Sequence, residues 1–155
     1  MRKMSWIAAL VLEVSPDGRH VLFVTDDPSS DDRVRLIRVA EVASGAIVPF
    51  KIVVRSPLTA SDQVLDGRAR FSADGRSILF VSADAQGRYG VYSQDFVPGR
   101  DTQATRRAVA GFNPDAMTES LGLSPDGKRL VVSSLQVFSS LQLVEGLPGL
   151  EPPRR

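Results

Sequence analysis

Carboxylate side chains are the residues of this sequence that could do chemistry, because they can hold a cation or transfer protons. The stretch TDDPSSDDR places Asp26, Asp27, Asp31 and Asp32 close together. Hard cations such as Ca²⁺ take several carboxylate and carbonyl oxygens, and a short acidic loop can supply them. The spacing does not match an EF-hand, however, and loops between strands are often acidic because water solvates them. We expect a solvated loop here and keep a calcium site as the alternative.

Three more aspartates, Asp17, Asp74 and Asp126, occur in a tetrapeptide that is written three times. It reads SPDG, SADG and SPDG along the chain and ends at Gly18, Gly75 and Gly127. Serine at the first position, proline at the second and glycine at the fourth are typical of a type I β-turn, and aspartate in a turn bonds the nearby backbone. We therefore predict that these aspartates hold turns and are not catalytic.

Nucleophilic and metal chemistry have few residues to draw on. The chain has one histidine, His20, and no cysteine, so neither a catalytic triad nor a metal site rich in histidine or thiolate can be assembled from it. The sequence also lacks the G-x-S-x-G elbow, the phosphate-binding P-loop and the H-R-D kinase loop. We predict that the chain is not an enzyme and that it has no catalytic, cofactor-binding or metal-ligating residues and no cofactor. His20 is expected to be exposed at the start of a strand.

The flanks of the tetrapeptide repeat as well, at intervals of 57 and 52 residues between the glycines. An apolar residue precedes each turn, a basic residue follows it, and one variable position leads into VLFVT, ILFVS or LVVSS. In chain order these elements are Val14, Phe71 and Leu123; Arg19, Arg76 and Lys128; and the runs 21–25, 78–82 and 130–134. Repeats of this length indicate stacked supersecondary units. Each unit is predicted to begin with a β-hairpin.

Further strands are predicted after each hairpin. In the first two units, alternating or apolar runs between turn signals indicate strands at 33–39, from 46 onward, at 89–95 and at 105–111. The third unit has one more alternating segment, 139–145, before Pro152 and Pro153 argue against a fourth strand. Segments 56–71 and 113–120 lack sustained helical periodicity, so we predict loops there.

The second strand of each hairpin is apolar at consecutive positions, which indicates that both faces of its sheet are buried. Small four-stranded antiparallel sheets bury both faces in a β-propeller, where each blade packs between two others. A β-sandwich is the alternative, but it would show cleaner alternation and no repeat. We predict an all-β single domain over 1–155, a partial β-propeller of three antiparallel blades. The blades are expected at about 6–54, 66–111 and 118–147, the last one incomplete, with a proline-rich tail at 148–155.

The segments VSPDGRHVLFVT, FSADGRSILFVS and LSPDGKRLVVSS resemble the blade repeat of TolB-like β-propellers. That repeat has an aromatic or aliphatic residue, Ser-Pro-Asp-Gly, a basic residue and an apolar run, and the resemblance covers roughly residues 10–145. The segment LQLVEGLPG is also similar to the closing blade of propellers appended to bacterial serine/threonine kinases. The resemblance implies a non-catalytic sensor or scaffold part of a larger protein or assembly, which binds a protein or peptide.

Two other functions stay open for such a chain. One is the propeller portion of a prolyl-oligopeptidase-type serine peptidase whose catalytic domain lies on another segment. The other is a truncated remnant without an independent function. A propeller closes its ring with about four to eight blades, so three blades need further blades from an upstream segment or self-association. Two chains placed head to tail would close a six-bladed ring with two-fold symmetry, but the sequence favours a fragment of a longer propeller.

Composition limits the partners further. Lys and Arg total 19 against 18 for Asp and Glu, a net charge of +1 without a long run of one sign, so we predict no nucleic-acid partner. The start, MRKMSWIAALVLEVS, has the basic-then-apolar order of a secretory signal but no small-x-small cleavage site, and is predicted to lead into a strand. The longest apolar run is too short to span a bilayer, so no membrane insertion is expected. The resemblance permits a periplasmic, extracytoplasmic or cytoplasmic location.

Aromatic residues could line a ligand surface, but core packing is their more common fate. We expect a core position for Trp6, Phe96, Phe112 and Phe138. The segment YSQDFVPGRDTQATRR, residues 92–107, combines aromatic, turn and basic residues at an expected blade edge. It is the best candidate for a contact surface, because loops on a rigid scaffold commonly carry binding residues.

Overall fold

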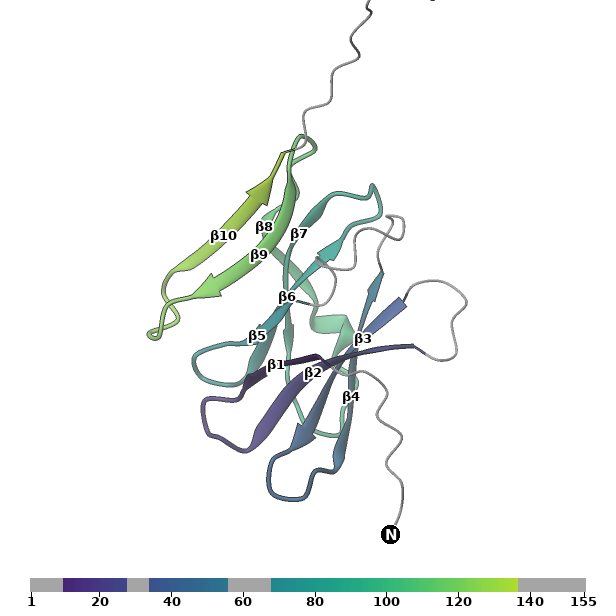
Figure 1. Ribbon diagram of the computed structural model, residues 1–155, viewed down its shortest axis with the longest axis vertical. Helices are drawn as coiled ribbons and strands as arrows, with labels where there is room; N and C mark the ends of the chain where they lie inside the picture. The colour runs from purple at the N-terminus through teal and green to yellow at the C-terminus, as the bar shows by residue number, and fades with distance from the viewer. Residues whose placement is uncertain (1–9, 28–33, 56–67, 137–155) are drawn as a thin grey trace, which may run out of the picture.

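The computed structural model describes residues 10–27, 34–55 and 68–136 of the chain. These residues form ten β-strands and one short 3₁₀ helix, η2 (Gln103–Thr105), arranged in three antiparallel sheets (Figure 1). Within the described residues none of the three sheets closes into a barrel, and no α-helix occurs. The prediction of an all-β chain is confirmed.

Strands that follow one another in sequence are neighbours in each sheet. The first sheet is β1 (Leu10–Val14), β2 (His20–Asp26), β3 (Val34–Glu41) and β4 (Ile47–Arg55). The second sheet is β5 (Ala69–Phe71), β6 (Ser77–Ala83), β7 (Tyr89–Asp95) and β8 (Arg107–Gly111). The third sheet is described as β9 (Met117–Leu123) and β10 (Leu130–Leu135). Each sheet therefore folds up and down as a simple meander.

The repeated tetrapeptides form the hairpin turns, as the sequence predicts. In the first turn the Gly18 amide donates to the Ser15 carbonyl over 2.8 Å, and the Ser15 amide donates to the His20 carbonyl over 2.8 Å. Gly18 has a φ of 71°, a left-handed conformation that glycine adopts without strain. The other two turns repeat these bonds and this glycine conformation. The sequence similarity of the three turns therefore corresponds to one repeated geometry.

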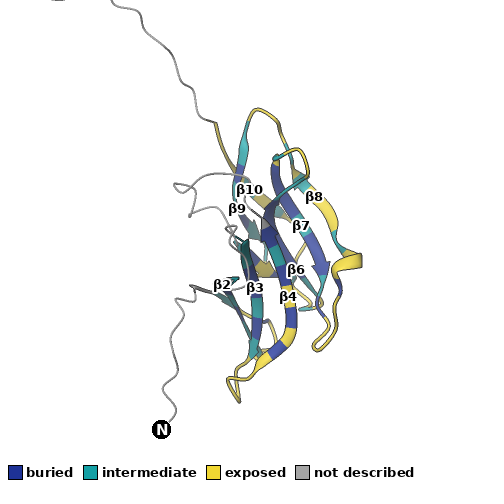
Figure 2. Ribbon diagram, turned by 90° about the vertical axis from the view of Figure 1, so that its right-hand side faces the viewer, coloured by how far each residue is buried: buried dark blue, intermediate teal, exposed yellow. Residues whose placement is uncertain are grey.

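Strand β6 is buried on both faces. Ile78 and Phe80 belong to the apolar core shared with the first sheet, whereas Leu79 and Val81 belong to the core shared with the third sheet. Burying each such side chain contributes about 1.5–3 kcal/mol. Figure 2 shows the strands β6 and β7 largely in dark blue, and Figure 1 shows the second sheet between the first sheet and the third. The consecutive apolar residues of this strand are therefore explained by its central place between two sheets.

The strands that precede the turns lie side by side, β1 next to β5 and β5 next to β9. The Glu13 carboxylate of β1 lies 3.2 Å from the Arg70 Nη1 atom of β5 and accepts the Phe71 amide over 2.7 Å. Arg70 in turn donates from Nε to the Leu121 carbonyl of β9 over 3.3 Å. Hydrogen bonds to charged groups are stronger than neutral ones. This short polar chain links all three sheets along the strands that lie together.

Successive turns are also stacked. A Cβ atom built on Gly75 would lie 3.6 Å from the Pro16 Cδ atom, and one built on Gly127 would lie only 2.9 Å from the Ala73 Cβ atom. The second residue of each turn thus covers the glycine of the next turn. Glycine at the fourth position is required here by φ and, at Gly127, by space.

Three predicted boundaries are corrected. Segment 113–120 was expected to be a loop, but β9 begins at Met117 because its side chains pack on the core of β6 and β7. The fourth strand of the second unit was expected at 105–111, but it begins at Arg107 because η2 occupies the residues before it. Residues 69–71 of the expected loop at 56–71 form β5, the strand that the predicted hairpin requires before its turn. Residues 1–9, 28–33, 56–67 and 137–155 lie outside the described residues, and with them most of that loop, the strand at 139–145 and the tail at 148–155.

Replacing Gly127 by alanine tests the stacking of the turns. We expect Gly127→Ala to lower the free energy of unfolding by about 1–3 kcal/mol more than Gly45→Ala, because only the former adds overlap to the cost of a positive φ. Gly45 is a matched control, since its φ is 67° and no atom lies within 4 Å of the added Cβ. Urea unfolding measures both, and equal losses would contradict the stacked turns.

Candidate functional site

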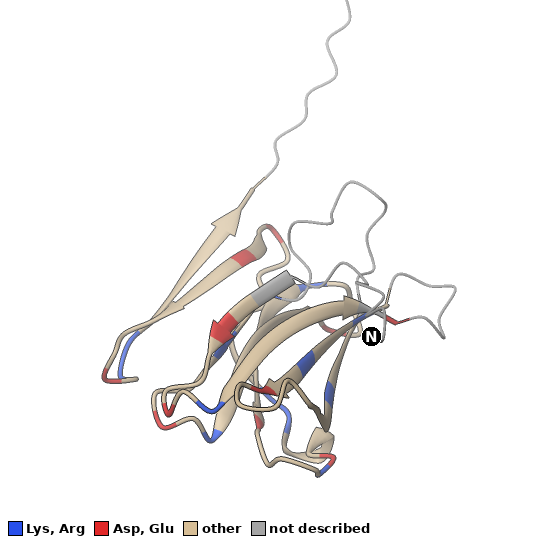
Figure 3. Ribbon diagram, turned by 60° about the horizontal axis from the view of Figure 1, so that its bottom comes forward, with Lys and Arg blue, Asp and Glu red and all other residues tan. Residues whose placement is uncertain are grey.

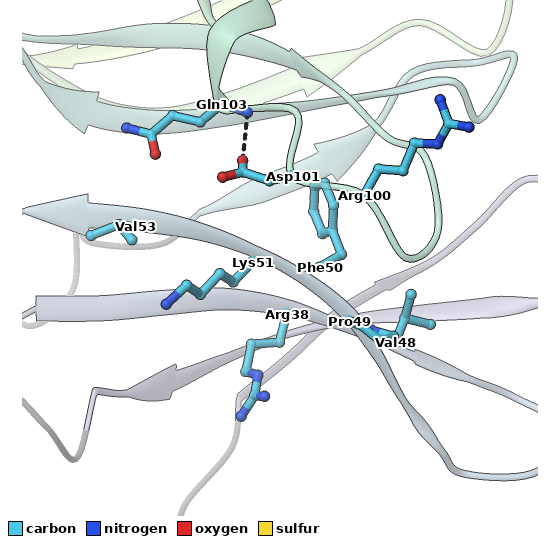
Figure 4. A pocket seen from close by; sticks show the side chains of 9 residues that line it. All are labelled: Arg38, Val48, Pro49, Phe50, Lys51, Val53, Arg100, Asp101 and Gln103. Atoms are coloured by element: carbon cyan, nitrogen blue, oxygen red, sulfur yellow. Dashed lines mark hydrogen bonds between the residues drawn. The ribbon is translucent and has the colours of Figure 1, made fainter.

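A hollow of about 300 Å³ lies between β4 and the loop that follows β7 (Figure 4). Its lining residues are Arg38, Val48, Pro49, Phe50, Lys51, Val53, Arg100, Asp101 and Gln103. Residues from two sheets, far apart in the sequence, therefore meet at this place.

Strand β4 provides one wall because, among the described strands, it is the last of the first sheet and has no neighbour beyond it there. Its side chains alternate, so that Val48, Phe50 and Ile52 are buried while Pro49 and Lys51 are exposed. Proline lacks an amide hydrogen and is suited to such an edge strand. The apolar side chains of the wall therefore point to the core, and Lys51 lies on the opposite face of the strand.

The loop is positioned by a buried amide. Gln94 is fully buried on β7, and its Nε2 atom donates to the Thr102 Oγ1 atom over 3.2 Å. The Thr102 hydroxyl donates to the Asp95 carbonyl, and the Asp101 Oδ1 atom accepts the Gln103 amide over 2.9 Å. Buried polar groups that are all satisfied fix one arrangement of the chain. Residues 100–103 are thus held against β4.

Arg106 joins the loop to both sheets. Its Nε and Nη2 atoms each donate to the Gln94 Oε1 atom over 3.2 Å, and Nη2 also donates to the Val53 carbonyl of β4 over 3.4 Å. The guanidinium carbon lies 4.9 Å from the centre of the Phe80 ring, a cation–π arrangement. Burial lowers the pKa of Arg106 from its ordinary value, and Tyr92 opposes that shift. Arginine remains charged at neutral pH, so the sheets are bridged by a cation.

The electrostatic character of the hollow is cationic. Arg38, Lys51 and Arg100 line it, against the single carboxylate of Asp101. The Arg38 Nε atom is buried and has no hydrogen-bond partner among the described residues. In Figure 4 the Arg38 side chain points away from the loop that carries Asp101 and Gln103. Val48 and Phe50 add apolar lining. The hollow therefore suits a peptide in which an acidic residue is next to an apolar one.

The predicted contact segment 92–107 supplies part of this site. It contributes Arg100, Asp101 and Gln103, whereas β4 and Arg38 were not anticipated. Arg106 lies within this segment as well and is half-buried in the network described above. A lysine and a proline within the apolar run VPFKIVV are the signal in the sequence that could have indicated an edge strand facing a partner.

His20 was predicted to be exposed, and this is wrong. It lies at the start of β2 but is only partly exposed, because its ring packs edge-on against Phe96 with centres 5.2 Å apart. Phe96 is buried in the core, as predicted. Phe112 is partly buried and contacts Tyr92, with ring centres 5.0 Å apart.

Several other aromatic and acidic candidates are not among the residues that the structure describes. Trp6 and Phe138 lie outside the described residues, as do Asp31 and Asp32 of the acidic stretch and the side chain of Asp26. Asp27 has an interaction partner. Across residues 10–27, 34–55 and 68–136, no group of three or more acidic, histidine or cysteine side chains is arranged to hold a metal ion.

The three repeated aspartates hold their turns, as predicted. The Asp17 Oδ1 atom accepts the Ser15 hydroxyl over 2.6 Å and the Arg19 amide over 3.0 Å. Asp74 and Asp126 make the same two bonds in their own turns. The serine hydroxyl first, and then the backbone amide, lower the pKa of each carboxyl below its ordinary value of 3.8. These carboxylates are therefore structural acceptors.

The surface has no dominant charge. Figure 3 shows acidic and basic residues interspersed, with both kinds near the turns. No helix in the described part of the chain has the length and apolar character needed to cross a membrane. Neither family models nor curated proteins match this sequence. The site must therefore be interpreted from its own geometry.

Arg106→Lys tests the network that holds the loop against β4. We expect it to lower the free energy of unfolding by about 1–3 kcal/mol, because lysine cannot bond Gln94 from two nitrogens while stacking on Phe80. The neighbouring Arg107 is exposed, so Arg107→Lys should change stability by no more than about 0.5 kcal/mol. Urea unfolding of the pair measures this, and equal effects would argue against a structural role for Arg106.

The turn carboxylates should make stability dependent on acid. Because their pKa values are lowered in the folded state, their contribution is present above the ordinary value and is lost as pH falls through the folded pKa. We expect the variant Asp17→Asn, Asp74→Asn, Asp126→Asn to be less stable than wild type at about pH 7. The difference should shrink as pH falls below about 4. Thermal unfolding across this range checks it, and a difference that does not depend on pH would contradict the assignment.

Proposed function

We propose that this chain is part of a β-propeller of the TolB-like type and serves as a non-catalytic module that binds a protein or peptide. The observation that carries the binding proposal is the hollow beside β4, which Arg38, Lys51 and Arg100 line against the single carboxylate of Asp101. The module would be a sensor or scaffold part of a larger protein or assembly. Function in such folds lies in sites on the loops and edges, not in the fold itself.

The propeller part of the proposal is supported by how the three sheets repeat. The first two are four-stranded antiparallel meanders, the third is described as an antiparallel hairpin, and the strands before the turns, β1, β5 and β9, are successive neighbours. Blades of a propeller are such meanders arranged around an axis. The repeated SPDG turns, which resemble the TolB-like blade repeat, lie at the same place in each sheet.

The character of the partner follows from the lining of the hollow. Three cations and the apolar side chains Val48 and Phe50 favour a peptide segment with a carboxylate next to an apolar residue. Pairing a carboxylate with arginine gives a charge-assisted bond. The Nη2 atom of Arg106 already occupies the Val53 carbonyl, which disfavours the addition of a full partner strand along the edge of β4. Recognition through side chains is therefore proposed.

A peptide array tests this proposal. Immobilised ten-residue peptides with acidic, basic and neutral versions of the same apolar sequences would be probed with the labelled chain and with the variant Arg38→Gln, Arg100→Gln. We expect acidic peptides to be selected, with binding about tenfold weaker or more for the variant, equivalent to about 1.4 kcal/mol. Binding should also weaken with salt, because the cations are partly exposed.

Arg19→Gln is the matched control, because Arg19 is an exposed cation in the first turn, outside the hollow. It should bind the selected peptides as wild type does. Selection of basic or neutral peptides, or equal losses for the control and the double variant, would refute the hollow as the binding site.

A further inference from the structure

The first sheet has a second apolar face that the described residues leave exposed. Val14 immediately precedes the first turn and is 51% exposed, whereas Phe71 at the same position of the second sheet is 4% exposed. Val42 and Phe96 are likewise equivalent, because their amides donate to the carbonyls of Arg19 and Arg76, each over 2.8 Å. Val42 is 51% exposed and Phe96 8%. The residues that attach the second sheet to the first thus have exposed apolar counterparts on the first sheet.

The third sheet exposes the face opposite to the one that packs on the second sheet. Val131 lies seven residues after the serine of its turn, as Leu22 and Leu79 do in theirs. Leu22 packs in the core between the first two sheets and Leu79 in the core between the second and third. Their exposed fractions are 0% and 8%, against 69% for Val131. The face of the third sheet that carries Val131 corresponds to the face with which each preceding sheet receives the next.

The turns repeat this asymmetry. Pro16 covers Gly75 and Ala73 covers Gly127, but Gly18 has no atom within 4 Å of an added Cβ. Pro125, at the position of Pro16 and Ala73, is exposed. The chain therefore carries an exposed proline at one end of the series of turns and an uncovered glycine at the other.

We propose that a second copy of this chain covers both faces. The third sheet of each chain would pack on the first sheet of the other, placing Pro125 over Gly18 and Val131 against the face that carries Val14 and Val42. Repeating one interface twice closes a two-fold ring of six sheets. This inference rests on the proposed propeller architecture, whose rings contain about four to eight blades.

The third sheet limits the area of the contact, because the structure describes only its strands β9 and β10. A face of about five residues by two strands covers roughly 150 Å². Two interfaces, each covering two such areas, would bury on the order of 600 Å² between described residues, about half of the smallest standard interface. Arg38, opposite Phe23 in the register, corresponds to Tyr92, opposite Phe80, and Tyr92 packs against the core between the first two sheets. The second copy would therefore cover Arg38. Lys51 corresponds to the exposed Ala108, so it stays accessible at the outer strand.

Engineered disulfides test the contact directly, because the chain has no cysteine of its own. The variant Pro125→Cys, Gly18→Cys places thiols at the two positions that meet only between copies. The variant Pro16→Cys, Gly75→Cys is the control, since it places them at equivalent turn positions within one chain, with the same loss of proline and a nearly identical glycine φ. Single variants of the first pair should form no bond alone but should link when mixed.

We expect the first variant to give, on oxidation, a species of twice the 16.8 kDa of one chain, and the control to lose its free thiols without changing mass. If the control is oxidised within one chain, the stacking of the sheets is upheld. In that case a first variant that stays at the mass of one chain, or that gives a ladder of larger species, would overturn the closed dimer. Failure of the control itself would remove the proposed propeller packing, and the dimer with it.

A second variant keeps the test independent of cysteine. Val131→Asp should convert the dimer to a single chain in light scattering without lowering the melting temperature of that chain, because Val131 is largely exposed in it. Val109→Asp is the matched control, since Val109 is an exposed valine on β8, away from the proposed contact. Loss of the dimer in both variants, or in neither, would contradict the interface.

Discussion

Burial of both faces of β6 is the constraint on which the remaining structure depends. Side chains of a strand alternate between two faces, so a strand that is apolar at four successive positions must have a layer on each side. Ile78 and Phe80 meet the first sheet, and Leu79 and Val81 meet the third. The second sheet can therefore be stable only between two others. The same reasoning applied to the first and third sheets leads to the inference that their exposed faces are covered by a second copy.

Polar contacts determine how the sheets sit on one another. Hydrophobic burial is not directional, so apolar faces alone would tolerate several orientations. The bond from Arg70 to the Leu121 carbonyl and its pairing with Glu13 join the strands that precede the turns. At the other side of the second sheet, Arg106 and Gln94 join the loop to β4. Because these two sets of bonds lie on opposite strands of the sheet, they fix the geometry in which the hollow forms.

Local chemistry made much of the fold predictable. The turns carry their own signals, and the strands that follow them are short and apolar, so ten strands could be anticipated in outline. The candidate site was less accessible to prediction. Arg38 and Arg100 are brought together only by the packing of two sheets, and nothing near Arg106 in the sequence indicates that it is half-buried. His20 was misjudged for the same reason, since its neighbour Phe96 comes from the next sheet.

The most direct measurement of the central claim, that successive sheets stack in one repeated orientation, is the nuclear Overhauser effect between adjacent turns. We expect cross-peaks between the Pro16 Hδ and Gly75 Hα protons and between the Ala73 Hβ and Gly127 Hα protons, since a Cβ atom built on Gly75 or Gly127 would lie 3.6 Å or 2.9 Å from the partner carbon. We also expect the ordinary cross-peaks between β1 and β2, which depend on one sheet alone. Cross-peaks within the sheets without any between the turns would contradict the stacking.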